Sequence, residues 1–310
     1  MKIKDIKIGE SYTMSVVVLS STIRNTRAGK AYLDMEVFDG IDSINGKIWD
    51  WTHKNNIEKN AILDLQGTMS EYLGAKQLAV ASYARNTELS TSTFAPNSPF
   101  DPEEYLQAAR DMIDNIEPVD LRNLTLKVFL DHTSQLMSVP GAKKIHHAYV
   151  AGTLIHIVET ARKALAIAST VPEAHKGLCV AGALLHDIGK LYTYTLDGAS
   201  IDFTEEGESL DHIVLGLICL GNYKTTENQS IIQLLEHIVA SHHGRLEYGS
   251  PVTPHFIEAW IVHFADNMDA KAETIRALCA KATGNYTEKE WSLENKRMLT
   301  YKRVRELLGE

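Results

Sequence analysis

The stretch GALLHDIGK, residues 182–190, places a histidine and an aspartate side by side directly after an apolar run. Both side chains bind metal ions, but a single short motif often occurs by chance. The pair is explained equally well by a buried histidine and a local hydrogen-bond acceptor at the end of a helix. Its role therefore depends on which other polar residues the chain places on similar helices.

The composition is that of an ordinary globular protein. With 310 residues and 44% hydrophobic side chains, the chain can bury the cores of one to three domains. No apolar stretch approaches the roughly 20 residues that span a bilayer, and the N-terminal MKIKDIKIGE lacks the apolar run of a signal peptide. The three cysteines are widely spaced and form no CxxC motif. We therefore expect a cytoplasmic protein with no membrane partner, no disulfide and no cysteine-based zinc site.

The net charge of −9 is unevenly distributed. Residues 1–90 hold 11 of the 31 Lys and Arg and 11 of the 40 Asp and Glu, which leaves 20 basic against 29 acidic residues in 91–310. This balance argues against a broad electrostatic grip on duplex DNA. A phosphate-bearing substrate remains compatible with it, provided that metal ions supply the local positive charge.

The first part of the chain, residues 1–88, has the pattern of β-strands separated by turns. Stretches rich in Val, Ile, Thr and aromatic residues, bounded by AGK, DGID and LGAK, predict strands over 13–23, 31–39, 43–50, 61–69 and 77–84. Residues 52–60, between the third and fourth strands, are long enough for a short helix. Five strands in this order predict a small all-β OB-fold barrel, with another small barrel, such as an SH3-like one, as the alternative.

The pattern changes after residue 88. Residues 89–100 are rich in Ser, Thr and Pro without any period, which predicts a linker. From residue 101 to 310 the apolar spacing is helical and predicts an all-α domain. The expected helices cover 103–116, 121–137, 149–168, 175–191, 210–221, 228–243 and 254–282.

Several histidines and aspartates lie within or at the ends of these apolar helices. Each one alone is explained by a hydrogen-bonded core position, because an unpaired buried polar group costs several kcal/mol. One shared metal centre would satisfy them all together. Imidazole and carboxylate without thiolate suit Mn²⁺, Fe or Zn²⁺, and a carboxylate beside a histidine can bridge two ions. The residues concerned are His156, His186, Asp187, His212, His242, His243 and Asp266.

The order H…HD…H…H…D resembles that of the HD-domain phosphohydrolases. With the OB-like domain before it, and with IHHAYVAGTLIH (145–156) and ASHHGRLEYGSPVTPHFIEAW (240–260), the chain resembles the bacterial YhaM-type 3′–5′ exoribonucleases almost end to end. The resemblance implies a first metal ion held by His156, His186, Asp187 and Asp266. It implies a second that shares Asp187 and adds His212 and His242, with His243 as a further ligand or a support. Manganese is the expected metal, and iron or another divalent ion is the alternative.

The resemblance also suggests residues that contact substrate. Lys190 corresponds to a catalytic lysine expected at the phosphate, although a cation at a helix end is an equal explanation. Arg245 could clamp a phosphate, with a solvated surface arginine as the alternative. His146 and His147 match a histidine doublet that would line the pocket, and Asp269, one turn after Asp266, would support a ligand.

The expected barrel offers its own nucleic-acid contacts. Tyr32 and Trp49 lie on outward positions of the second and third strands and could stack bases, or they could be ordinary surface aromatics. Acidic side chains on the same face would weaken such a platform. Basic residues on the loop between the first two strands could grip a single strand: Arg24, Arg27 and Lys30.

Together these features predict a divalent-metal-dependent phosphodiesterase that shortens single-stranded RNA, with single-stranded DNA as a second substrate and a homo-oligomer as a further expectation. Polarity, RNA preference and release of nucleoside 5′-monophosphates follow from the resemblance alone. One alternative is a nucleotide or cyclic-dinucleotide phosphohydrolase with a regulatory OB domain. Another is a nucleic-acid-binding protein with a purely structural metal centre.

Overall fold

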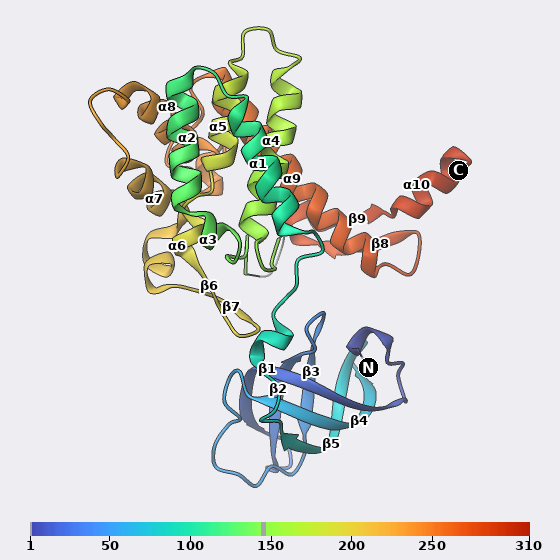
Figure 1. Cartoon of the computed structure of the whole chain (residues 1–310). Helices are drawn as coiled ribbons and strands as arrows, with labels where there is room; N and C mark the ends of the chain where they lie inside the picture. Colours follow the sequence, from blue (N-terminus) through green and yellow to red (C-terminus); the bar gives the residue numbers. More distant parts are fainter. Residues whose placement is uncertain (1, 144–146) are drawn as a thin grey trace. The chain divides into compact units, whose positions relative to one another are not determined.

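The structure is a computed structural model that describes residues 2–143 and 147–310, and it divides into two compact units (Figure 1). The first unit consists of the chain up to Pro99 together with Leu196–Asp202. The second consists of Phe100–Thr195 and Phe203–Glu310. Residues 196–202 thus belong to the first unit although they come from the later part of the chain. The sequence did not predict this.

The first unit is a closed five-stranded barrel in the order β1-β2-β3-β5-β4. Neighbouring strands are antiparallel except β3 and β5, which are parallel. This is the strand order of an OB-fold, so that prediction is confirmed. The elements are η1 (Ile3–Asp5), β1 (Ser11–Asn25), β2 (Ala31–Phe38), β3 (Ser43–Ile48), β4 (Ile62–Tyr72), β5 (Ala75–Arg85) and η2 (Thr91–Phe94).

Strand alternation fills the barrel and fixes which residues face out. Leu33, Met35 and Val37 of β2 are buried, whereas the residues between them are partly exposed, as the period of two requires. The long strand β1 pairs with β4 through its first half and with β2 through its second, and its register shifts between Val18 and Ser20. Such an irregularity bends a strand and helps a sheet to close.

The expected short helix in residues 52–60 is wrong, because this segment contains turns and bends only. Two groups of this segment accept hydrogen bonds from β1. Ser21 Oγ donates to the carbonyl of Ile57, and the side chain of Asn56 accepts from the amide of Ile23. Trp51, just before the segment, belongs to the barrel core, and Ile57 packs against this core, which holds the segment on the barrel.

The segment predicted as a linker is partly packed against the barrel. Phe94 lies in a small apolar cluster with Val17, Ile62 and Ala199. Ala199 belongs to a hairpin that the sequence did not predict, formed by β6 (Tyr194–Asp197) and β7 (Ser200–Phe203). Two polar contacts hold the same hairpin segment within the first unit: Lys59 with Asp202, and Asn60 with Asp197.

The second unit is helical around one large apolar core, as predicted, and adds a hairpin and a C-terminal helix near its end. No helix among the described residues is long and apolar enough to cross a membrane. The helices are α1 (Pro102–Asp114), α2 (Val119–Asp131), α3 (Thr133–Leu136), α4 (Gly152–Ala168), α5 (Lys176–Leu185), α6 (Lys190–Thr193), α7 (Glu205–Gly221), α8 (Gln229–Ser241), η3 (Leu246–Tyr248), α9 (Ile257–Lys281) and α10 (Tyr301–Leu308). The added hairpin consists of β8 (Tyr286–Glu290) and β9 (Lys296–Leu299), with η4 (Trp291–Leu293) between them.

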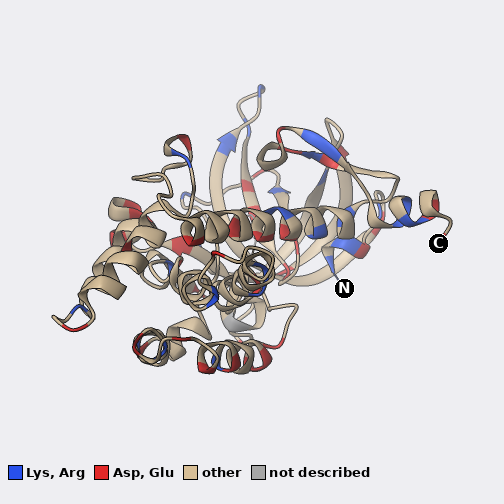
Figure 2. Cartoon of the chain, turned by 90° about the horizontal axis from the view of Figure 1, so that it is seen from above, with Lys and Arg blue, Asp and Glu red and all other residues tan. Residues whose placement is uncertain are grey.

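The acidic surplus of this unit is spread over its helices and is not gathered in one cluster (Figure 2). Part of it lies in the first turns of α1 and α7, where Asp and Glu stabilise the exposed amides of a helix N-terminus. These carboxylates therefore have local structural roles. The carboxylates relevant to chemistry are the few that the apolar core buries.

Candidate metal centre

Five segments of the helical unit bring the predicted ligands together in its core. His156 comes from α4, His186 and Asp187 from the turn after α5, and Asp266 from α9, while α7 and the end of α8 supply His212, His242 and His243. The turn after α5 fits only because Gly189 has no side chain. A Cβ at that position would lie 1.8 Å from the carbonyl oxygen of His212, so glycine lets the turn approach α7.

The first group of ligands is compact. His156 Nε2 lies 3.2 Å from His186 Nε2, 3.2 Å from Asp187 Oδ2 and 3.2 Å from Asp266 Oδ1. His186 Nε2 lies 3.3 Å from the same Asp187 oxygen. Two imidazoles and two carboxylates thus direct their coordinating atoms at one point, which is the ligand set that the resemblance implied for the first metal ion.

Backbone carbonyls fix the tautomers of three of these histidines. The Nδ1 atoms of His186 and His242 lie 2.7 and 2.8 Å from the carbonyl oxygens three residues earlier. His243 Nδ1 lies 2.8 Å from the carbonyl of Tyr248. Because a carbonyl only accepts, each Nδ1 carries a proton, which leaves Nε2 as the ring nitrogen that can bind a metal ion. Burial also lowers the pKa of His242 well below its ordinary value, so that ring is neutral.

The second group contains buried atoms that lack a partner. Asp187 Oδ1 and His212 Nε2 have no hydrogen bond to any described residue, and they lie 3.6 Å apart. His242 Nε2 lies 3.6 Å from the same oxygen. A buried polar atom without a partner costs about 1–3 kcal/mol, so this arrangement is unfavourable for the protein alone. A divalent cation would satisfy all three atoms, and the donor set therefore fits a metal ion.

The charges of the centre also fit a cation. Burial alone would lower the pKa of His156, but its contacts with three carboxylates raise that pKa well above the ordinary value. The same negative field favours a divalent cation. Burial alone would raise the pKa of Asp187, yet Lys190 and His186 hold it well below its usual range, so the carboxylate is ionised. Lys190 is itself buried, with its Nζ 2.7 Å from Asp187 Oδ2.

Asp269 supports the first group from behind. Its Oδ2 lies 2.7 Å from His156 Nδ1 and 2.9 Å from His147 Nε2, and its Oδ1 accepts from Lys163 Nζ at 2.9 Å. The contact to Nδ1 directs Nε2 of His156 at the other ligands. His147 was predicted to line the substrate pocket, but it is buried and contacts Asp269 and Tyr149, so we assign it to this network. His146 lies outside the described residues.

Asp211, which no sequence motif indicated, orients His212. Its carboxylate contacts His212 Nδ1, and this contact lowers the pKa of Asp211 to about 2. The backbone of Asp211 has φ 61° and ψ 162° inside α7, a conformation that is costly for a residue with a side chain. The only sequence signal was an acidic residue directly before a histidine.

The predicted substrate contacts outside the centre are exposed. Arg245 follows the histidine doublet by two residues, and its guanidinium lies 5.8 Å from the ring centre of Tyr248. In the barrel, Arg24 pairs with Asp34 at 3.0 Å and Lys30 with Asp50 at 3.4 Å. These two cations are thus partly neutralised by neighbouring acids. Arg27 is also exposed and lies between β1 and β2, as Lys30 does, whereas Arg24 lies within β1 and not on the predicted loop.

The aromatic surface of the barrel includes more residues than the two that the sequence predicted. Tyr32 and Trp49 have ring centres 5.0 Å apart, and Trp49 is exposed. Lys47 Nζ lies 5.2–5.7 Å from the ring centres of both and of Tyr72. Tyr72, at the end of β4, was missed because nothing in the sequence pairs it with β2 and β3.

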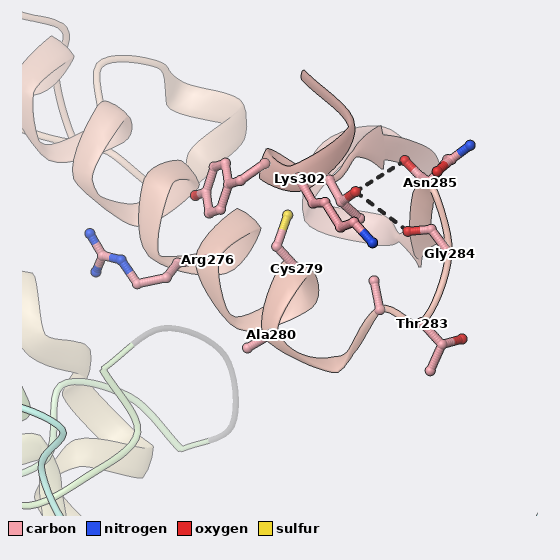
Figure 3. Close-up of a pocket in the computed structure, with 10 residues that line it drawn as sticks. Arg276, Cys279, Ala280, Thr283, Gly284, Asn285 and Lys302 are labelled. Atoms are coloured by element: carbon pink, nitrogen blue, oxygen red, sulfur yellow. Dashed lines mark hydrogen bonds between the residues drawn. The ribbon is translucent and has the colours of Figure 1, made fainter. Parts of the chain in front are cut away.

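A separate surface pocket lies between the end of α9 and the start of α10 (Figure 3). Its volume is about 490 Å³, and Arg276, Cys279 and Lys302 are among the residues that line it. The hydroxyl of Thr300 donates to the carbonyls of Gly284 and Asn285 there, which closes the loop before β8, and its oxygen accepts from the amide of Arg303, which caps α10. None of the predicted site residues lines this pocket.

Known proteins resemble both halves of the chain. The HD domain family matches residues 153–271, which contain the predicted ligands. The chain is 31% identical over 301 residues to the 3′–5′ exoribonuclease YhaM of Bacillus velezensis, covering 94% of this chain and 95% of that protein. The second OB-fold domain of replication protein A from Methanococcus maripaludis covers 29% of this chain and 96% of that domain, with 16% identity and a TM-score of 0.24. That score is low, so the OB assignment is argued here from strand order.

Proposed function

The chain belongs to the family of the bacterial 3′–5′ exoribonuclease YhaM, and from this premise we propose that it is a divalent-metal-dependent exonuclease. Its substrate would be single-stranded RNA, shortened from the 3′ end with release of nucleoside 5′-monophosphates, and single-stranded DNA would be a second substrate. The 31% identity extends over both units, which supports transfer of the whole activity and not of the HD domain alone.

The observation that carries the proposal is the convergence of buried coordinating atoms, two of which, Asp187 Oδ1 and His212 Nε2, have no hydrogen-bond partner among the described residues. His156, His186, Asp187 and Asp266 would hold one ion, and Asp187, His212, His242 and His243 the other. Divalent ions bound there would supply Lewis acidity toward a phosphodiester and neutralise its developing charge. Manganese is the metal we propose, as the family resemblance implies, and iron or zinc would suit the same imidazole and carboxylate ligands.

The protein's own residues would bind and position the phosphodiester. Lys190 keeps its ammonium charge although it is buried, because burial alone would lower its pKa but Asp187 raises it. It can therefore donate to a phosphate oxygen beside Asp187. Arg245 is exposed on the loop that carries His242 and His243, where it can reach the next phosphate along the strand.

The barrel would hold the single strand by stacking. Tyr32, Trp49 and Tyr72 surround Lys47 on its outer face, which offers ring surfaces for bases and one cation for a phosphate. The basic residues Arg24, in β1, and Lys30, just before β2, are paired with acids, so they contribute less. We therefore propose that bases are gripped mainly by aromatic contact.

The test is product analysis with purified full-length protein, Mn²⁺ and a single-stranded RNA carrying a label at either end. A 5′ label should appear in a ladder of progressively shorter oligomers, whereas a 3′ label should appear at once in a mononucleotide. Asp187→Ala and added chelator should both stop the reaction. Lys190→Met should lower kcat while Mn²⁺ binding persists.

Two results would contradict the proposal. Release of the 5′ label as a mononucleotide would reverse the polarity. Intact RNA, together with hydrolysis of a nucleoside triphosphate or a cyclic dinucleotide, would favour a nucleotide phosphohydrolase. Loss of long-RNA hydrolysis but full hydrolysis of a linear dinucleotide in Trp49→Ala would remain within the proposal, because the proposal assigns that residue to the strand and not to the metal centre.

A further inference from the structure

The exposed face of α9 is apolar over its first 14 residues. The exposed residues between Ile257 and Ala270 are Ile257, Trp260, Phe264 and Met268, with exposed fractions of 42, 37, 56 and 58%. At 100° per residue these four fall within about 80° of the helix circumference and extend about 16 Å along it. The polar residues of the same stretch are buried or only partly exposed. We call these four residues the α9 stripe.

A water-facing helix surface normally carries polar side chains, so an uninterrupted apolar stripe indicates a surface that is covered in solution. The rings of Trp260 and Phe264 already stack on each other, with centres 5.7 Å apart and planes inclined by 27°. The helix α10 also exposes apolar residues, but Lys302, Arg303 and Arg305 lie among them. The α9 stripe contains no charge.

We propose that a second copy of this chain covers the α9 stripe, and that the two α9 helices lie antiparallel across a twofold axis. The spacing of the stripe is nearly symmetric about the level of Val262. Trp260 and Phe264 lie two residues either side of it, and Ile257 and Met268 lie five and six residues away. In the antiparallel arrangement Trp260 meets Phe264 of the partner subunit, and Ile257 meets Met268 of the partner subunit.

The chemistry of the stripe favours a protein partner of this kind over nucleic acid. It includes aliphatic Ile257 and Met268 as well as two aromatic rings, and it offers no cation for a phosphate. A chain with a net charge of −9 repels its own copies, so association is least opposed where the surface is uncharged. Every pair that the twofold brings together in the stripe is apolar, with no like charges opposed.

Neighbouring side chains can widen the contact. Gly244 packs against the ring of His263, the residue before Phe264, so its loop lies alongside this part of α9. Two and four residues further along the chain, Leu246 and Tyr248 are exposed. A stable dimer usually buries about 800 Å² per partner, more than four side chains provide, and this loop supplies further apolar surface.

The first experiment measures the mass of the full-length protein by sedimentation over a dilution series. The wild type should have twice the chain mass of 34.5 kDa and dissociate on dilution. Trp260→Lys and Phe264→Glu should each have the mass of one chain, because each buries an unpaired charge against a ring. Val304→Glu is the matched control, since it places the same charge on the exposed face of α10 and should leave the dimer intact.

The second experiment mixes the two monomeric variants. In the antiparallel arrangement, one of the two sites in the mixed pair opposes the introduced ammonium and carboxylate, and the other restores the native Trp260 and Phe264 contact. The mixture should therefore form a dimer that neither variant forms alone. A wild type with the mass of one chain, single variants that stay dimeric, a mixture that stays monomeric, or a monomeric Val304→Glu would each overturn the proposal. Circular dichroism establishes that every variant is folded.

Discussion

Substitution of Asp269 by asparagine should weaken metal binding although Asp269 is not itself a proposed ligand. Asp269→Asn preserves the size of the side chain but removes its charge, and its amide nitrogen must face either Lys163 or the two histidines. The contact from His156 Nδ1, 2.7 Å long, is then weakened or lost. His156 can then rotate or change tautomer, and its Nε2 is no longer held toward the ligands.

The expected loss of Mn²⁺ affinity can be worked out from the one contact between Asp269 and His156. A hydrogen bond to a charged group contributes about 1.5–3 kcal/mol. At about 1.4 kcal/mol per factor of ten, this corresponds to roughly a 10–150-fold weaker affinity for Mn²⁺. The affinity should be measured by calorimetric titration of the chelator-treated protein, with RNA hydrolysis as a second readout.

A matched control separates metal positioning from general stability. Glu258 is another buried carboxylate on α9, and it accepts a hydrogen bond from the amide of His175 at 2.7 Å, apart from the proposed ligands. Glu258→Gln should lower the free energy of unfolding without changing Mn²⁺ affinity. Wild-type affinity in Asp269→Asn, or an equal loss of affinity in both variants, would refute the reasoning.

Three further results are expected. Asp187→Ala should remove metal and abolish hydrolysis, since both groups of ligands use this carboxylate; bound metal by elemental analysis and turnover would measure it. Gly189→Ala should lower the melting temperature, because its methyl group would lie 1.8 Å from a backbone oxygen of α7. Trp49→Ala should weaken RNA binding more than Lys30→Ala does, because stacking is worth about 1–3 kcal/mol per base and Lys30 is paired on the surface. In fluorescence titrations at several salt concentrations, the RNA affinity of the wild type should fall only gently as salt rises. A steep fall, together with unchanged RNA affinity in Trp49→Ala, would contradict this prediction.

The elements predicted from sequence are those that a local pattern determines. Alternation in β2 placed Leu33 and Met35 inside the barrel, and helical spacing placed α4 and α9 around the core. The hairpin β6–β7 was missed because its contacts are with the distant residues Phe94 and Asn60. The absent helix in 52–60 has the same cause, since long-range hydrogen bonds to β1 decide that segment.

The metal centre shows the same division between local and distant information. Residue type and helical position suggested the ligands, because few explanations account for so many polar residues in apolar helices. Their orientation depends on backbone carbonyls, on Asp269 and on the strained Asp211, which are set by the packed fold. The exposure of Trp260 and Phe264 could not be predicted either. Helical spacing shows that they share one face of the helix, but it does not show whether another element packs on that face.

The metal centre and the apolar core of the helical unit depend on each other. Apolar packing brings together ligands from five segments, but it also removes water from Asp187 Oδ1 and His212 Nε2, which no described protein group replaces. That cost is recovered only when a cation binds, so part of the binding free energy is folding free energy. At a metal concentration 100 times Kd this linkage contributes about 2.7 kcal/mol to stability. The proposed centre would therefore serve the stability of the core as well as phosphodiester chemistry, and α9 carries Asp266 and Asp269 together with the apolar stripe.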